Sequence, residues 1–94
     1  FNQTERGSRS VYVFDQPESR ITPIMEHLER TYAGVRSYSL PTVGRTDSDG
    51  RYIPPHIEFG IKAEGEACRL LDAAWVDALQ GLQEIGATLK ETVE

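Results

Sequence analysis

The stretch Pro55-His56-Ile57-Glu58-Phe59-Gly60-Ile61-Lys62-Ala63 decides the fold of this 94-residue chain. Its side chains alternate between apolar and polar. The apolar residues that point to one side are Ile57, Phe59 and Ile61, and the polar residues that point to the other are His56, Glu58 and Lys62. A period of two is typical of a β-strand with one buried face. We expect residues 53–63 to form the middle strand of a small sheet whose apolar side is covered by two helices.

The composition indicates one ordinary globular domain. The chain is 38% hydrophobic and 27% charged, with a formal net charge of −5. This excess of carboxylates argues against a stand-alone nucleic-acid-binding protein, which needs basic residues to neutralise phosphates. The single cysteine, Cys68, excludes an intrachain disulfide, and no apolar run is long enough to cross a membrane.

A first strand is predicted over residues 10–15, which are rich in β-branched and aromatic residues. Val11 and Val13 share one face, and Tyr12 and Phe14 share the other. Because both faces are apolar, one should meet the helices. The other should meet a missing domain or a second copy, unless Tyr12 and Phe14 simply lie at the sheet surface. These two aromatic residues are therefore the candidate interface.

A first helix is predicted after a turn at residues 16–18. Its N-terminal cap is either Ser19 or Thr22, the latter with Pro23 at the first helical position, and the sequence does not separate the two. An apolar stripe follows at helical spacing: Ile21, Ile24, Met25, Leu28 and Tyr32. Gly34 should end this helix, because glycine takes the left-handed conformation without strain.

A second strand is predicted over residues 35–43, at an edge of the sheet because Pro41 cannot donate to a ladder. The polar loop 44–51 should join it to the central strand as a long hairpin with Asp49-Gly50 at the tip. A long helix is predicted from Glu66. Its apolar stripe consists of Ala67, Leu71, Ala74, Trp75, Ala78, Leu82 and Ile85. Gly86 should end its packed part, and residues 87–94 should continue as a helical extension or tail.

Together these elements predict an α+β fold, a βαββα two-layer sandwich. A three-stranded mixed sheet would carry two helices on one face, as in a truncated ferredoxin-like domain. The outer edge of the first strand would stay open, as if a fourth strand were absent or supplied from elsewhere. The domain should span residues 10–86, with residues 1–9 as a linker or disordered tail. The start at Phe1, without Met, indicates a cut inside a longer protein or proteolytic processing.

The sequence predicts no catalytic, cofactor-binding or metal-binding residue. His27, His56 and Cys68 stand apart, whereas structural zinc ligands usually come in pairs two to four residues apart. The segment Asp47-Ser48-Asp49-Gly50 hints at a calcium loop, but its glycine is misplaced and Glu58, at the position of the last ligand, lies in a predicted strand. No nucleophile elbow, phosphate loop or G-x-x-G clamp is present.

Three residues are candidate contacts for an anion. Arg45 and Arg51 flank the long loop, and Ser19 stands at a predicted helix start, where backbone N–H groups attract negative charge. The competing interpretation is that both arginines are ordinary solvated loop residues, which are commoner.

Several motifs carry a family resemblance: Val11-Tyr12-Val13, Glu18-Ser19-x-x-x-Pro23-Ile24-x-x-x-Leu28, Tyr38-Ser39-Leu40-Pro41, residues 56–62, and residues 70–79 followed by Gly86. On these residues the chain resembles the small KH-type domain that follows the molybdopterin-binding-type domain in the competence/damage-inducible protein A (CinA) family. Related copies occur in eukaryotic FAD synthases. The motifs are diffuse, since many reflect βαββα packing itself. The insertion at residues 44–51 and the acidic charge depart from the family pattern.

The resemblance implies a cytoplasmic bacterial protein. In this family a larger domain, expected before Phe1, hydrolyses ADP-ribose or related pyrophosphates with a divalent metal, and no catalytic residue carries over to this chain. Our leading hypothesis is a non-catalytic accessory domain without a cofactor of its own. It would serve inter-domain packing or dimerisation, with the missing N-terminal domain or a second copy as partner. The alternative is a small ferredoxin-like regulatory module that binds an anionic ligand.

Overall fold

The central strand lies where the alternation predicts it. In the computed structural model, which describes residues 5–91, β5 (His56–Glu64) lies between β2 (Arg36–Thr42) and β1 (Arg6–Phe14). A fourth strand, β6 (Thr88–Glu91), pairs with the other side of β1 and completes the order β2-β5-β1-β6. β2 is at the edge of the sheet, as Pro41 predicts.

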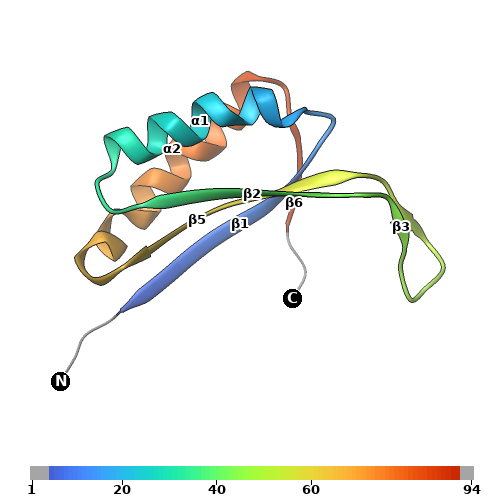
Figure 1. Ribbon diagram of the computed structural model, residues 1–94, viewed down its shortest axis with the longest axis horizontal. Helices are drawn as coiled ribbons and strands as arrows, with labels where there is room; N and C mark the ends of the chain where they lie inside the picture. Colours follow the sequence, from blue (N-terminus) through green and yellow to red (C-terminus); the bar gives the residue numbers. More distant parts are fainter. Residues whose placement is uncertain (1–4, 92–94) are drawn as a thin grey trace.

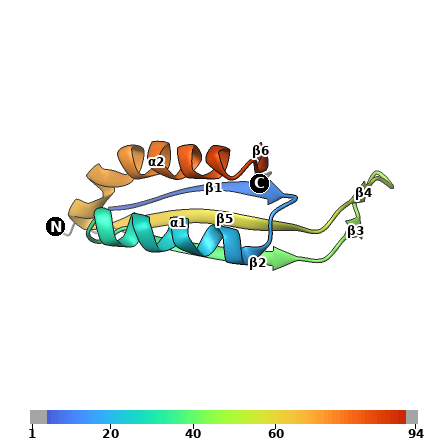
Figure 2. The same cartoon turned by 90° about the horizontal axis from the view of Figure 1, so that it is seen from above.

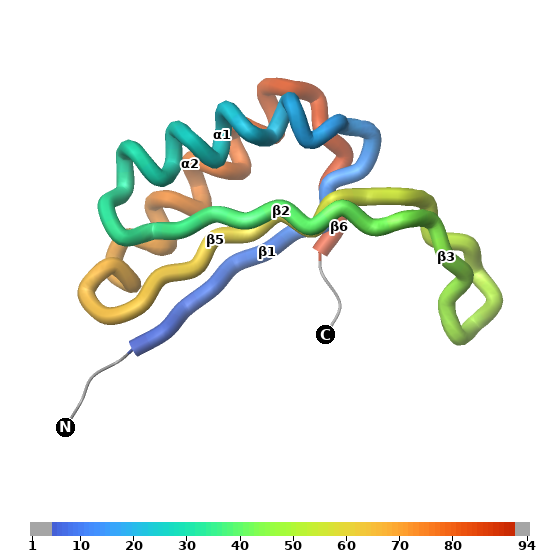
Figure 3. Tube along the Cα trace, in the orientation of Figure 1, coloured from blue at the N-terminus to red at the C-terminus, as the bar shows by residue number. Residues whose placement is uncertain are grey.

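Two helices cover one face of this sheet (Figures 1 and 2). α1 (Glu18–Thr31) joins β1 to β2, and α2 (Leu71–Glu84) follows β5 after the 3₁₀ helix η1 (Gly65–Leu70). β3 (Arg45–Thr46) and β4 (Tyr52–Ile53) form a separate hairpin that extends beyond the end of the sheet (Figure 3). The predicted α+β fold, with both helices on one face of a ferredoxin-like sheet, is confirmed.

The sheet itself differs from the prediction in two ways. It has four strands rather than three, and each neighbouring pair is antiparallel, so the sheet is not mixed. β6 pairs with residues 11–14 of β1, so the edge that we expected to be open is covered there by the same chain. The helical extension or tail expected over residues 87–94 is wrong for residues 88–91, and residues 92–94 lie outside the described part.

β1 also begins earlier than expected. The linker or tail predicted for residues 1–9 is wrong from Arg6 onward, because Arg6 to Arg9 pair in register with the last residues of β5. These residues are polar or glycine and carry no alternation, so it is their backbone pairing with β5 that places them in the sheet. Residues 1–4 lie outside the described part of the chain.

The core fills the space between the sheet and the helices. From the strands it takes every second residue: Val11 and Val13 of β1, and Ile57, Phe59, Ile61 and Ala63 of β5. From the helices it takes one stripe each: Ile21 and Leu28 of α1, and Leu71, Ala74, Ala78 and Leu82 of α2. The remaining predicted stripe residues pack against this core as partly buried side chains. Both helical stripes are therefore confirmed.

Both helices begin at other residues than predicted. α1 starts at Glu18 with Pro17 as its N-cap, and neither Ser19 nor Thr22 caps it. The Thr22 hydroxyl instead donates to the carbonyl of Glu18 one turn back, which places Thr22 inside the helix. Before α2, Gly65 takes a positive φ of 62° and the chain forms a 3₁₀ segment, so the α-helix starts at Leu71 rather than near Glu66.

Candidate functional site

The face of the sheet that points away from the helices is the main candidate site. No element within residues 5–91 covers it (Figure 1). Because β1, β5 and β2 pair in register, its side chains form rows across the sheet. The rows fixed by the pairing are Tyr12–Glu58–Leu40, Ser10–Gly60–Tyr38 and Ser8–Lys62–Arg36. We call this surface the open face.

The predicted interface residues Tyr12 and Phe14 meet at one end of the open face. Both are half-buried, and both rings contact the imidazole of His56, with centroids 4.6 Å and 5.0 Å away. His56 is only 8% exposed, and its Nδ1 lies 2.9 Å from the carbonyl oxygen of Pro54. The sequence places His56 on the polar side of the central strand but does not show that it completes an aromatic cluster.

Tyr38 lies in the middle of the open face, across the backbone of Gly60. A Cβ atom at Gly60 would lie 2.5 Å from the ring of Tyr38, so glycine is what allows the ring to lie there. The Tyr38 hydroxyl donates to Glu58 Oε2 at 3.1 Å. Burial, together with this carboxylate, raises the pKa of Tyr38 above its usual value. The phenol therefore stays protonated and acts as a hydrogen-bond donor.

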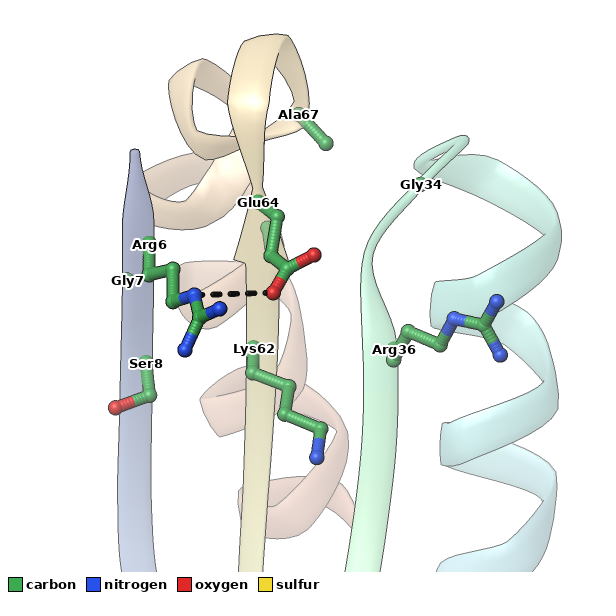
Figure 4. A pocket seen from close by; sticks show the side chains of 9 residues that line it. Arg6, Gly7, Ser8, Gly34, Arg36, Lys62, Glu64 and Ala67 are labelled. Carbon is green, nitrogen blue, oxygen red and sulfur yellow. Dashed lines mark ion pairs between the residues drawn. The ribbon is translucent and has the colours of Figure 1, made fainter. Parts of the chain in front are cut away.

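A basic pocket occupies the other end of the open face (Figure 4). Its volume is about 810 Å³, and three cationic side chains line it: Arg6, Arg36 and Lys62. Arg6 forms an ion pair with Glu64, with Nε 3.2 Å from Oε2, and both side chains are largely exposed. Ser8 and four small residues complete the lining: Gly7, Gly34, Ala63 and Ala67. Sequence reasoning missed this cluster.

The three residues predicted to contact an anion do not form a site together. Ser19 lies exposed in the first turn of α1, while Arg45 lies exposed in β3 and Arg51 in the turn before β4. The hairpin that carries both arginines extends beyond the sheet (Figure 3), and no hydrogen bond or ion pair within residues 5–91 links it to Ser19.

The candidate metal ligands also remain apart. Within residues 5–91, no group of three or more His, Cys, Asp or Glu side chains could hold a metal ion. Cys68 is half-buried, and its thiol donates to the carbonyl of Ala63 at 3.4 Å. His27 instead links the two helices, because its Nε2 lies 2.9 Å from Asp77 Oδ2, which also accepts a hydrogen bond from the Tyr32 hydroxyl at 3.0 Å.

The outer edge of β2 is protected against pairing with another strand. The backbone N–H of Ser37 donates to Glu29 Oε2 on α1 at 2.8 Å, so it points away from β5. Because N–H groups alternate between the two sides of a strand, Ser39 and Pro41 share this direction, and proline has no N–H. Of Ser37, Ser39 and Pro41, only Ser39 therefore keeps a backbone N–H that could donate to a strand added at this edge. This edge is poorly suited to extending the sheet.

Two carboxylates should make the stability of this domain sensitive to acid. The hydrogen bond from His27 holds the pKa of Asp77 below its usual 3.8, and hydrogen bonds from Ser37 hold the pKa of Glu29 below its usual 4.5. Since both pKa values are lower in the folded state, the unfolded chain binds more protons as the pH falls. We expect the free energy of unfolding to decline from about pH 5 to about pH 3, by roughly 0.5 kcal/mol per carboxylate because both sites are solvent-screened.

Urea unfolding across that pH range measures this effect. Asp77→Asn and Glu29→Gln should each flatten the dependence, and His27→Ala should act like Asp77→Asn because it removes the donor that lowers the pKa. An unchanged slope in Asp77→Asn and in Glu29→Gln would contradict the assignment.

No known protein family and no curated protein matches the chain. Among solved structures, the fold is similar to part of a Burkholderia cenocepacia protein described, provisionally, as an amidohydrolase/peptidase. The TM-score is 0.43 at 16% sequence identity, and the match covers 97% of this chain but 28% of the other. A similarity at this level carries no argument about function. None of the helices within residues 5–91 is long and apolar enough to cross a membrane.

Proposed function

We propose that this chain is a non-catalytic accessory domain of a CinA-like, molybdopterin-binding-type protein, and that it forms a homodimer through its open face. The observation that carries the dimer is the aromatic cluster of Tyr12, Phe14 and His56 on a sheet face that no described element covers. Tyrosine, phenylalanine and arginine are enriched at protein interfaces, where aromatic side chains often supply much of the binding energy.

A second copy fits this face better than an added strand fits an edge. The β2 edge is protected by Glu29 and Pro41, and the other edge strand of the sheet, β6, has only four described residues, which makes it a short template for pairing. The open face carries charges of both signs: Arg6, Lys62 and Lys90 with Glu58 and Glu64. In a two-fold contact the same surface meets itself, so cations of one copy can face carboxylates of the other.

The proposal places the chemistry elsewhere in a longer protein. The resemblance to the CinA family supports an upstream domain with nucleotide or ADP-ribose pyrophosphatase activity and a cytoplasmic location. Within residues 5–91 the His27–Asp77 pair is exposed on the helical side and supports the packing of α1 on α2. We therefore assign this domain to assembly, with the upstream domain as the other candidate occupant of its open face.

The Tyr12→Glu variant should break the homodimer. Tyr12 pairs with Glu58 of β5 and Lys90 of β6 within the proposed contact, so a carboxylate there would be desolvated beside another carboxylate. We expect light scattering to report twice the 10.5 kDa chain mass for the unsubstituted protein, and a dimer dissociation constant raised at least about tenfold in Tyr12→Glu.

Tyr52→Glu is the matched control, because Tyr52 is a tyrosine that is 67% exposed and lies in β4 of the hairpin, outside the open face. It should leave the dimer intact, and circular dichroism should show that both variants are folded. A strict monomer at all concentrations would refute the homodimer. If the chain then bound a separately produced upstream domain and Tyr12→Glu abolished that binding, the open face would be an inter-domain contact instead.

A second candidate function is the binding of a small anion. The specific observation in its favour is the basic pocket, which collects three cations and one carboxylate on a chain with a net charge of −5. It does not involve Ser19, Arg45 or Arg51.

A further inference from the structure

Two cations lie side by side on the open face without a carboxylate between them. Lys62 of β5 and Arg36 of β2 are direct neighbours in the register of the two strands. Like charges at directly opposed positions destabilise a sheet. Within residues 5–91, neither side chain forms an ion pair, and the Lys62 Nζ lies 6.0 Å from the centroid of the Tyr38 ring. The Arg36 charge helps to hold the pKa of the Glu29 carboxyl on α1 below its usual value, so this carboxylate offsets part of the repulsion.

A third cation lies in the next row. Arg6 pairs with Glu64, but their side chains are 75% and 64% exposed, so the pair is weak and Arg6 can turn toward another anion. Figure 4 shows Lys62 extending across the space between β5 and β2, while Arg36 extends toward α1. Arg36 lines the pocket, and its long, exposed side chain can turn toward a bound anion. Ser8, which is the partner of Lys62 on β1, also lines the pocket, but its hydroxyl points away from Lys62 (Figure 4).

We propose that this pocket binds a phosphorylated small molecule, with its phosphate between Lys62 and Arg36 and with Arg6 as a further contact. A phosphate carries close to two negative charges and several acceptor oxygens, which suits three cationic donors better than a singly charged carboxylate does. The flat ring of Tyr38 in the adjoining row offers a surface for the organic part of the ligand. The inference rests on the second candidate function.

Thermal unfolding with inorganic phosphate, pyrophosphate and ADP tests this site, with sodium chloride and sodium acetate at matched ionic strength. We expect pyrophosphate and ADP near saturation to raise the melting temperature by about 5 °C or more, and chloride and acetate to have little effect. Calorimetric titration should show that Lys62→Gln and Arg36→Gln each weaken pyrophosphate binding at least about tenfold.

The same variants give a signature that a structural role would not produce. Without ligand and at low salt, Lys62→Gln should melt at a higher temperature than the unsubstituted chain, because the repulsion between neighbouring cations is gone. Arg36→Gln should gain less, because it also loses the attraction between Arg36 and Glu29. Arg45→Gln and Arg51→Gln are the two control variants, because both substitutions lie on the hairpin. Each should keep the original melting temperature and the pyrophosphate response.

Three results would overturn the proposal. The first is the absence of any phosphate-dependent rise, which would also remove the second candidate function. The second is an equal response to acetate, which would leave anion binding in place but refute the phosphate preference. The third is a response that survives in Lys62→Gln but disappears in Arg45→Gln or Arg51→Gln, which would keep anion binding and move its site to the hairpin.

Discussion

Replacement of Phe59 by alanine is expected to lower the free energy of unfolding by roughly 3–5 kcal/mol. Phe59 is the largest of the fully buried side chains. It lies on the central strand, and its ring stacks on Trp75 of α2 with centroids 6.0 Å apart and planes 13° from parallel. The substitution therefore opens a cavity where the sheet meets the helices. Since small domains have a total stability of roughly 5–15 kcal/mol, much of the margin would be lost.

Urea unfolding monitored by circular dichroism and by Trp75 fluorescence measures this change. Val76→Ala is the control on the same helix, because Val76 is 57% exposed, and it should change the free energy of unfolding by less than roughly 0.5 kcal/mol. If Phe59→Ala proved as mild as Val76→Ala, the core would not lie where the structure places it.

The main architecture was predictable because one face of each strand is buried. A one-residue shift would move Phe59 and its neighbours from the core to solvent, so the alternation fixes which face is which. The same rule separates the buried Val11 and Val13 from Tyr12 and Phe14 on the open face. The edge position of β2 was equally predictable from Pro41, because proline has no backbone N–H to donate to a neighbouring strand.

The fourth strand was not predictable from local sequence. β6 has four residues, and only Leu89 among them is apolar, so no alternation marks it. Its conformation depends on pairing with β1 and on the packing of Leu89 against the core, both of which require the rest of the fold. The first residues of β1 were missed for the same reason, since the polar segment from Arg6 to Arg9 is held by β5.

The candidate sites differ in the same way: some follow from a single strand, and others depend on the pairing of two strands. Tyr12 and Phe14 could be assigned to one face because alternation within a single strand is a local property. The proximity of Arg36 to Lys62 depends on the register between two strands, and Arg6 lay in a segment that we predicted to be a linker. Alternation predicts the face of a strand that a side chain occupies but does not predict which residue lies opposite it.

Gly60→Ala is the second substitution with a large expected effect. Alanine normally stabilises a strand relative to glycine by roughly 0.5–1 kcal/mol, because glycine loses more conformational freedom on folding. Here a Cβ atom would lie 2.5 Å from Tyr38 Cζ and 2.7 Å from the carbonyl oxygen of Arg9. We expect this overlap to dominate and to destabilise the domain by roughly 2 kcal/mol in urea unfolding.

The double variant Gly60→Ala/Tyr38→Ala separates the two overlaps. Tyr38 can move aside only by giving up its hydrogen bond to Glu58, whereas the Arg9 carbonyl belongs to the β1 backbone that pairs with β5 and cannot move cheaply. In the Tyr38→Ala background, Gly60→Ala should therefore still destabilise the domain, but by roughly 1 kcal/mol less than in the unsubstituted chain. Equal costs in both backgrounds would show that Tyr38 does not lie across Gly60. A stabilising Gly60→Ala would show that β1 and β5 do not approach as closely as their register requires.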